Sequence, residues 1–165
     1  MRRCAPLIIN MQFLSLTSRF EAAANFLQSP VLLVLRLFWG WQFVQTGWGK
    51  LMHLERTAGF FQGLGIPAPH LNAFMAGGTE CLGGCLLVLG LYARLASVPL
   101  IATMLVAYVT AEKEALAAIT SDPDKFTSAA PFLFLGTAII VLGFGPGIFS
   151  VDRLLKRQQP INKEA

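Results

Sequence analysis

The sequence has few charged residues. Only 13% of its 165 residues are Asp, Glu, Lys or Arg, and 55% are hydrophobic, whereas a soluble domain of this length carries about 25% charged residues. So little polar surface cannot coat a globule in water. A membrane-spanning helix needs about 20 apolar residues, which leaves room for four helices and their connections. The composition therefore predicts an all-α integral membrane protein, a four-helix transmembrane bundle.

The sequence also lacks the motifs of self-contained enzymes. It contains no Walker A loop, no GxSxG elbow, no HExxH pair and no dinucleotide fingerprint. Cys81 and Cys85 lie four apart in an apolar run, which is poorly suited to a disulfide within one helix. Two histidines without further ligands at metal-binding spacing predict no metal site. These residues leave enzyme activity open, and no cofactor is evident from them.

The positive charge is distributed as in a membrane protein. The net charge of +4 comes from cations beside apolar segments, so the predicted partner is a lipid bilayer and not a nucleic acid. One predicted side carries Arg2, Arg3, Arg19, Arg94, Arg153, Lys156, Arg157 and Lys163. The other side carries Lys50, Arg56, Lys113 and Lys125. The positive-inside rule then predicts a protein of the bacterial inner membrane with both termini in the cytoplasm.

The apolar pattern divides the chain into three parts. Residues 1–29 are predicted to be an N-terminal tail with an amphipathic helix at the membrane interface, starting at either Met1 or Met11. Residues 30–149 hold the four-helix domain, and residues 150–165 form a cytoplasmic C-terminal tail. The four spans are predicted at residues 30–51, 70–92, 95–118 and 124–143.

The connections between the spans carry turn and cap signals. Residues 52–69 are predicted to form a loop from which Phe60 and Phe61 dip back into the membrane. Asp122 suits the N-cap of the fourth span and Pro123 suits its first helical position. These signals predict a sharp start for the last helix.

Two ionisable residues lie inside apolar runs. Arg36 falls in the first predicted span and Glu80 in the second. A charge at the centre of a spanning helix costs about 2.5–3.5 kcal/mol on insertion scales. Both side chains are therefore predicted to face the bundle interior and to share a polar core. Two interpretations stay open: a structural clamp between helices, or part of a ligand pocket, for which quinone is one candidate.

Helical periodicity extends this polar core. At 100° per residue, Arg36 shares a stripe with Gly40, Gly47 and Lys50. The second span places Gly77, Gly84 and Glu80 on one face, and such small residues let membrane helices approach closely. The candidate polar or ligand-binding residues are Arg36, Glu80, Lys50, Gln42 and His53. The candidate structural residues are Gly40, Gly47, Gly65, Pro67, Gly77, Gly84, Arg94 and Asp152.

The order of these motifs resembles that of the DoxX family of small four-helix bacterial membrane proteins. The resemblance covers roughly residues 30–155. Its segments are LLVLRLFWGWQFVQTGWGKL, FFQGLGIPAPHLNAFMAGGTECLGGCLLVLGLYAR and FGPGIFSVDRLL. The pattern positions are Arg36, Gly47, Lys50, Gly65, Pro67, Glu80, Arg94 and Asp152.

The resemblance implies several functions. The family is named from a membrane subunit linked to thiosulfate:quinone oxidoreductase, a mycobacterial relative is tied to oxidative-stress defence, and members are often called oxidoreductases. It implies a subunit or accessory of a membrane redox or stress-defence system, with quinone as a ligand and protein partners in a membrane complex. The alternatives are a non-enzymatic scaffold for an exported or metal-handling partner, and a small proton-coupled transporter using Glu80. Assembly into a homo-oligomer is left open.

Overall fold

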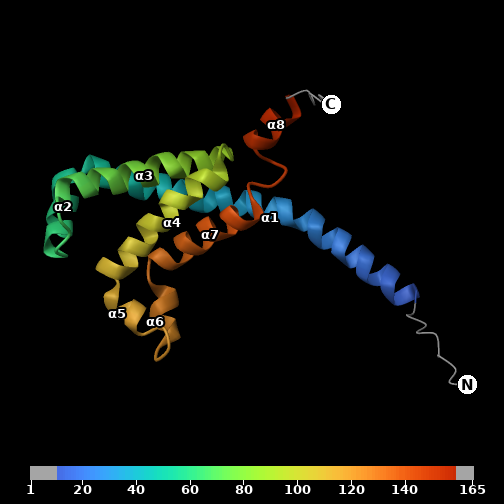
Figure 1. Cartoon of the computed structure of the whole chain (residues 1–165), viewed down its shortest axis with the longest axis horizontal. Coiled ribbons are helices and arrows are strands. Elements are labelled where there is room, and N and C mark those ends of the chain that lie inside the picture. Colours follow the sequence, from blue (N-terminus) through green and yellow to red (C-terminus); the bar gives the residue numbers. More distant parts are fainter. Residues whose placement is uncertain (1–10, 159–165) are drawn as a thin grey trace, which may run out of the picture.

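The computed structural model describes the backbone of residues 11–158 and the side chains of residues 26–155. Within that part every regular element is a helix and none is a strand, which confirms the predicted all-α class. Figure 1 shows one long helix, α1, with α3 and α7 packed against the half of it that is farther from the N-terminus. The alternative start at Met1 and the last residues of the tail lie outside the described residues.

Helix α1 spans Met11–Met52 without a break. The predicted break between the interfacial helix and the first span at residue 30 is wrong, because Pro30 lies inside α1. Proline removes one backbone hydrogen bond from a helix, but strong helix formers at residues 22–24 and the apolar run after Pro30 favour helix on both sides. As a result the first part of α1 extends past the other helices (Figure 1).

Helix α3 (Pro69–Leu89) runs antiparallel to the second half of α1 along a seam of glycines. A Cβ atom on Gly84 would lie 2.7 Å from the carbonyl oxygen of Gly40. A Cβ on Gly47 would lie 2.6 Å from the carbonyl oxygen of Gly77. Only glycine fits at such distances, so the two backbones touch directly, as small residues allow between membrane helices. These four glycines fix the register of α1 against α3.

Helices α4 (Ala93–Thr110) and α7 (Pro131–Phe144) pack against each other and complete the core. Phe43 of α1 and Leu87 of α3 are fully buried against this pair of helices. The third predicted span is shorter than expected, because its helix ends at Thr110 and the short helix α5 (Lys113–Ala117) follows.

Two connections differ from the predicted ones. The predicted loop over residues 52–69 contains the helix α2 (Leu54–Gly63). The predicted fourth helix is divided into α6 (Pro123–Ser128) and α7, because the backbone is extended at Ala129 and Pro131, which lacks an N–H, begins a new helix. The predicted start is confirmed: Asp122 is the N-cap of α6, and its carboxylate accepts a hydrogen bond from the Lys125 N–H.

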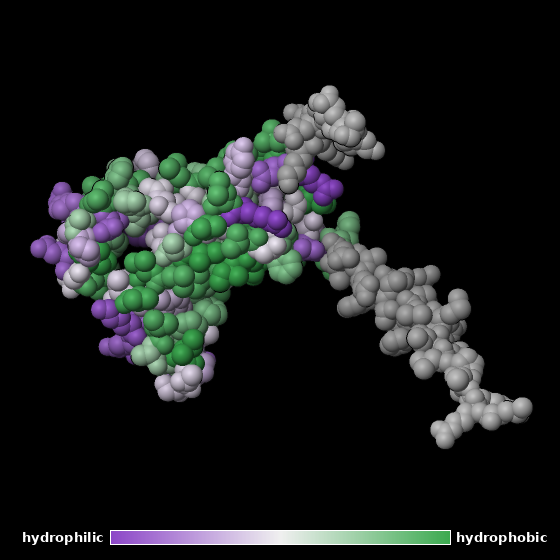
Figure 2. Space-filling model, in the orientation of Figure 1, coloured by the Kyte–Doolittle hydropathy of each residue, from purple (hydrophilic) through white to green (hydrophobic). Residues whose placement is uncertain are grey.

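The described surface is strongly apolar. Figure 2 shows hydrophobic residues covering much of the visible face of the body, with hydrophilic residues gathered toward its ends. Within residues 11–158, α3 and α4 are long and apolar enough to cross a membrane. Helix α7 is also apolar, but its 14 residues extend only about 21 Å at 1.5 Å per residue. The last helix, α8 (Val151–Gln158), follows the α7–α8 connection at the end of the bundle where α3 ends.

Candidate ligand pocket and end clamp

A buried ion pair joins α1 to α3. Lys50 Nζ lies 2.5 Å from each carboxylate oxygen of Glu80. The Glu80 side chain is 1% exposed and the Lys50 side chain is 31% exposed. Lys50 belongs to the last turn of α1, where a cation is favoured by the negative end of the helix dipole. The buried carboxylate is thus neutralised by a lysine that remains partly accessible.

The prediction that Arg36 and Glu80 share one polar core is wrong, although both side chains are buried. Gly47 packs against Glu80, since a Cβ on Gly47 would lie 2.9 Å from the Cβ of Glu80. Along α1, Lys50 lies about one turn after Gly47. Arg36 lies before Gly47, about 16 Å away along the helix axis at 1.5 Å per residue. Arg36 instead lies level with the end of α3, where its Nε donates a hydrogen bond to the Leu87 carbonyl.

The ion pair lines a cavity of about 430 Å³ between α1, α2, α3 and α4. The walls are mostly apolar and include Phe60 and Phe61 of α2, Met75 of α3 and Val106 of α4. Threonine and asparagine side chains provide the remaining polar groups, at Asn72, Thr79, Thr103 and Thr110. Ligand pockets are typically about 300–1,000 Å³, apolar, with a few placed polar groups. We call this cavity the ion-pair pocket.

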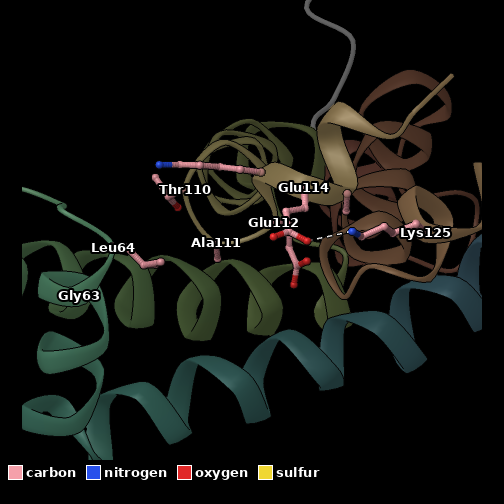
Figure 3. Close-up of a pocket in the computed structure, with 9 residues that line it drawn as sticks. Gly63, Leu64, Thr110, Ala111, Glu112, Glu114 and Lys125 are labelled. Atoms are coloured by element: carbon pink, nitrogen blue, oxygen red, sulfur yellow. Dashed lines mark hydrogen bonds and ion pairs between the residues drawn. The ribbon is translucent and has the colours of Figure 1, made fainter. Parts of the chain in front are cut away.

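A second, more polar recess adjoins the ion-pair pocket (Figure 3). The two share Leu64, Thr110 and Ala111 in their walls. Lys125 Nζ donates a 2.9 Å hydrogen bond to Glu114 in this recess, and this bond and the lysine charge lower the pKa of the Glu114 carboxyl. The recess therefore adds charged groups next to the apolar pocket.

Arg36 binds backbone carbonyl groups at the opposite end of the seam. Its side chain is 1% exposed. Nε donates to the Leu87 carbonyl at 2.9 Å and Nη2 to the Val88 carbonyl at 3.3 Å. Nη1 donates to the carbonyls of Pro146 and Phe149. The last carbonyls of a helix lack helical N–H partners and form its negative end, so Arg36 ties the end of α3 to the α7–α8 connection.

Asp152 performs the complementary role at the start of α4. Its Oδ1 accepts a 2.8 Å hydrogen bond from the Tyr92 N–H and its Oδ2 a 3.3 Å bond from the Ala93 N–H. The first N–H groups of a helix have no helical acceptor, and a carboxylate there satisfies them and matches the positive helix end. Asp152, which belongs to α8, therefore caps the start of α4.

Arg94 and Gly90 complete this cluster. Arg94 Nη2 donates a 3.2 Å hydrogen bond to the Gly143 carbonyl near the end of α7. Gly90 has a φ of 66°, and a Cβ there would lie 2.8 Å from the Cβ of Ser150 and against the Arg36 guanidinium. Only glycine suits this position. We call Arg36, Gly90, Arg94 and Asp152 together the end clamp.

The remaining predicted residues lie outside the ion-pair pocket. Gln42 is partly exposed and does not line it. His53 is exposed at the N-cap of α2 and does not line it either. Gly65, with a φ of 75°, and Pro67 shape the turn from α2 to α3, where the Pro67 carbonyl accepts a bond from Asn72 Nδ2. Within the described residues no three His, Cys, Asp or Glu side chains form a group able to hold a metal ion.

Sequence reasoning missed most of the pocket wall. The residues that α4 contributes, such as Pro99 and Val106, look like any other apolar residue of a spanning helix. Phe60 and Phe61 were predicted to approach the membrane from a loop, but they line the pocket from a helix. The sequence did contain a signal for the Lys50–Glu80 ion pair, because Lys50 lies on the same helix stripe as Gly47.

The protein is thus small and all-helical within the described residues, and buried polar groups join its apolar helices. Comparison with known proteins identifies its family. The DoxX family model matches residues 31–113. The uncharacterized membrane protein Rv3486 of Mycobacterium tuberculosis is 32% identical over 141 residues, covering 78% of this chain and 83% of that protein. No solved structure matches. The chain belongs to the DoxX family of membrane proteins.

Proposed function

We propose that this protein binds an amphipathic ring-bearing lipid, such as a quinone, in the ion-pair pocket and supports a membrane redox or stress-defence partner. The observation that carries the proposal is an ion pair with a buried carboxylate in the wall of a mostly apolar cavity of about 430 Å³. The partly exposed Lys50 ammonium is suited to donate a hydrogen bond to a carbonyl oxygen. The apolar walls suit a ring and an attached hydrocarbon chain.

The proposal includes a membrane arrangement. The second half of α1, together with α3, α4 and α7, crosses a bacterial inner membrane, as the domain over residues 30–149. Both termini are cytoplasmic, so the end clamp lies at the cytoplasmic side and the ion-pair pocket toward the outer side. Alkaline phosphatase and fluorescent-protein fusions at Arg94 and Asp122 test this: Arg94 is expected to be cytoplasmic and Asp122 outside, and the reverse result contradicts the arrangement.

Ligand binding is tested with the full-length protein in lipid nanodiscs and radiolabelled decylubiquinone as the probe. The variant is the double replacement Lys50→Met/Glu80→Leu, which removes both charges and leaves neither unpaired. We expect affinity to fall about ten- to a hundredfold, as for a lost hydrogen bond to a charged group. The matched control is Lys125→Met/Glu114→Leu, which removes the exposed ion pair and is expected to bind normally.

A scaffold without a ligand is the second candidate. Among the described residues, no buried side-chain nitrogen or oxygen lacks a hydrogen-bond partner. The buried polar groups therefore need no ligand to complete their hydrogen bonds, which favours a scaffold. A purely structural Lys50–Glu80 pair would give the double variant the same decylubiquinone binding as the wild type, and co-purified proteins would be retained. Proton-coupled transport, the third alternative, predicts proton-dependent flux in liposomes that is lost in Glu80→Gln.

A further inference from the structure

The face of α1 that points away from the bundle carries a polar side chain. Gln45 is exposed, and none of the side-chain hydrogen bonds among the described residues involves it. At 100° per residue it lies nearly opposite the buried stripe of Gly40, Phe43 and Gly47. Gln45 therefore points outward from α1.

Gln45 also lies at the depth of the centre of α3. Gly47, two residues away on the same helix, packs against Glu80. Glu80 lies near the middle of α3, one of the two helices within residues 11–158 that are long and apolar enough to span a membrane. An amide facing hydrocarbon without a hydrogen-bond partner is unfavourable. Side-chain amides at this depth are satisfied by hydrogen bonds to another helix.

The surroundings of Gln45 suit close packing by a helix. Phe38, Trp41 and Trp48 are each more than half exposed on this side of α1. Gly49 lies one turn beyond Gln45, and a Cβ there would meet nothing within 4 Å. Exposed rings beside a glycine gap allow an approaching helix to interlock with this face.

We propose that this outer face of α1, made of Phe38, Trp41, Gln45, Trp48 and Gly49, binds the same face of a second copy of the chain. A glutamine side chain both donates and accepts hydrogen bonds, so two Gln45 amides can satisfy each other across a two-fold axis. Copies inserted in the same direction place Gln45 at equal depth, and the two-fold axis then runs along the membrane normal. A two-fold interface uses one self-complementary patch. The ion-pair pocket lies on the other side of α1, so this dimer does not depend on the proposed ligand.

The test counts photobleaching steps of the full-length, fluorescently tagged protein in liposomes over a series of protein-to-lipid ratios. The wild type is expected to show mainly two steps at the higher ratios. Gln45→Leu is expected to weaken dimerisation about three- to thirtyfold, the range for hydrogen bonds between membrane helices. Gly49→Leu is expected to weaken it as well, by filling the gap. Within the monomer a Cβ at Gly49 meets nothing within 4 Å, so the loss is expected to report docking and not folding.

The matched control is Gly136→Leu in α7, where a Cβ also meets nothing within 4 Å. It is expected to dimerise like the wild type. Single-step bleaching of the wild type at every ratio overturns the proposal. Unchanged dimerisation in both Gln45→Leu and Gly49→Leu also overturns it, as does an equal loss in Gly136→Leu.

Discussion

Separating the two partners of the ion pair tests the geometry of the pocket. Lys50→Met leaves the Glu80 carboxylate, which is 1% exposed, without its counter-charge. Removing one partner of a buried pair costs about 3–5 kcal/mol. The Lys50 side chain is 31% exposed, so solvent reaches part of the pair and the lower end, about 3 kcal/mol, is the appropriate expectation. Glu80→Gln leaves a lysine that can turn its ammonium group toward water, and should cost only about 1 kcal/mol.

The double variant Lys50→Met/Glu80→Leu should recover most of the loss, because neither charge remains. The measurement is the thermal unfolding midpoint of each purified variant in one detergent. At about 2–4 °C per kcal/mol for a chain of this size, Lys50→Met should lower Tm by roughly 6–12 °C. If Glu80→Gln proved as harmful as Lys50→Met, or if the double variant were worse than both, the ion-pair geometry would be wrong.

The other predictions concern the end clamp and the recess. Asp152→Ala removes the cap of α4 and should lower the free energy of unfolding by about 0.5–2 kcal/mol, while Asp152→Asn, which keeps an acceptor, should be closer to wild type in the same thermal unfolding assay. Arg36→Lys should cost about 1–3 kcal/mol or more, because one ammonium cannot replace hydrogen bonds to carbonyls of α3 and of the α7–α8 connection at once; wild-type stability of this variant would contradict the clamp. Lys125 lowers the pKa of Glu114 in the folded protein. Any stability that the pair contributes is therefore present above the ordinary value of 4.5 and is lost as pH falls through the lowered pKa. The free energies of unfolding of the wild type and Glu114→Gln should converge at low pH, and a difference that grows on acidification would contradict this sign.

The helical class could be predicted from the sequence, because low charge and long apolar runs leave a chain few other folds. The inward burial of Arg36 and Glu80 also followed from the cost of charge in a spanning helix. Their partners could not be assigned, because partner choice depends on the register between α1 and α3. That register comes from glycine contacts between distant segments, such as Gly40 with Gly84, and not from helix ends counted along the chain.

Local breaks were harder to predict for a different reason. Pro30 lies within a continuous helix, whereas Pro131 begins a new one. Residues on both sides of Pro30 favour helix, whereas the backbone at Ala129 is extended, with a ψ of 137°. The carbonyl acceptors of Arg36 had no signal in the sequence, because every residue has a carbonyl group and only the fold selects which ones meet the guanidinium.

The binding site of the proposed ligand can be mapped by finding where a bound ring-bearing lipid contacts the chain. The full-length protein in nanodiscs is photolabelled with a diazirine-bearing ubiquinone analogue, digested and analysed by mass spectrometry, with and without excess decylubiquinone. We expect decylubiquinone to compete with labelling of the pocket walls within residues 60–66 and 99–111, and we expect this labelling to be lost in Lys50→Met/Glu80→Leu. Labelling confined to exposed residues outside the pocket, such as Leu82 and Phe144, and unaffected by decylubiquinone would contradict the proposed site.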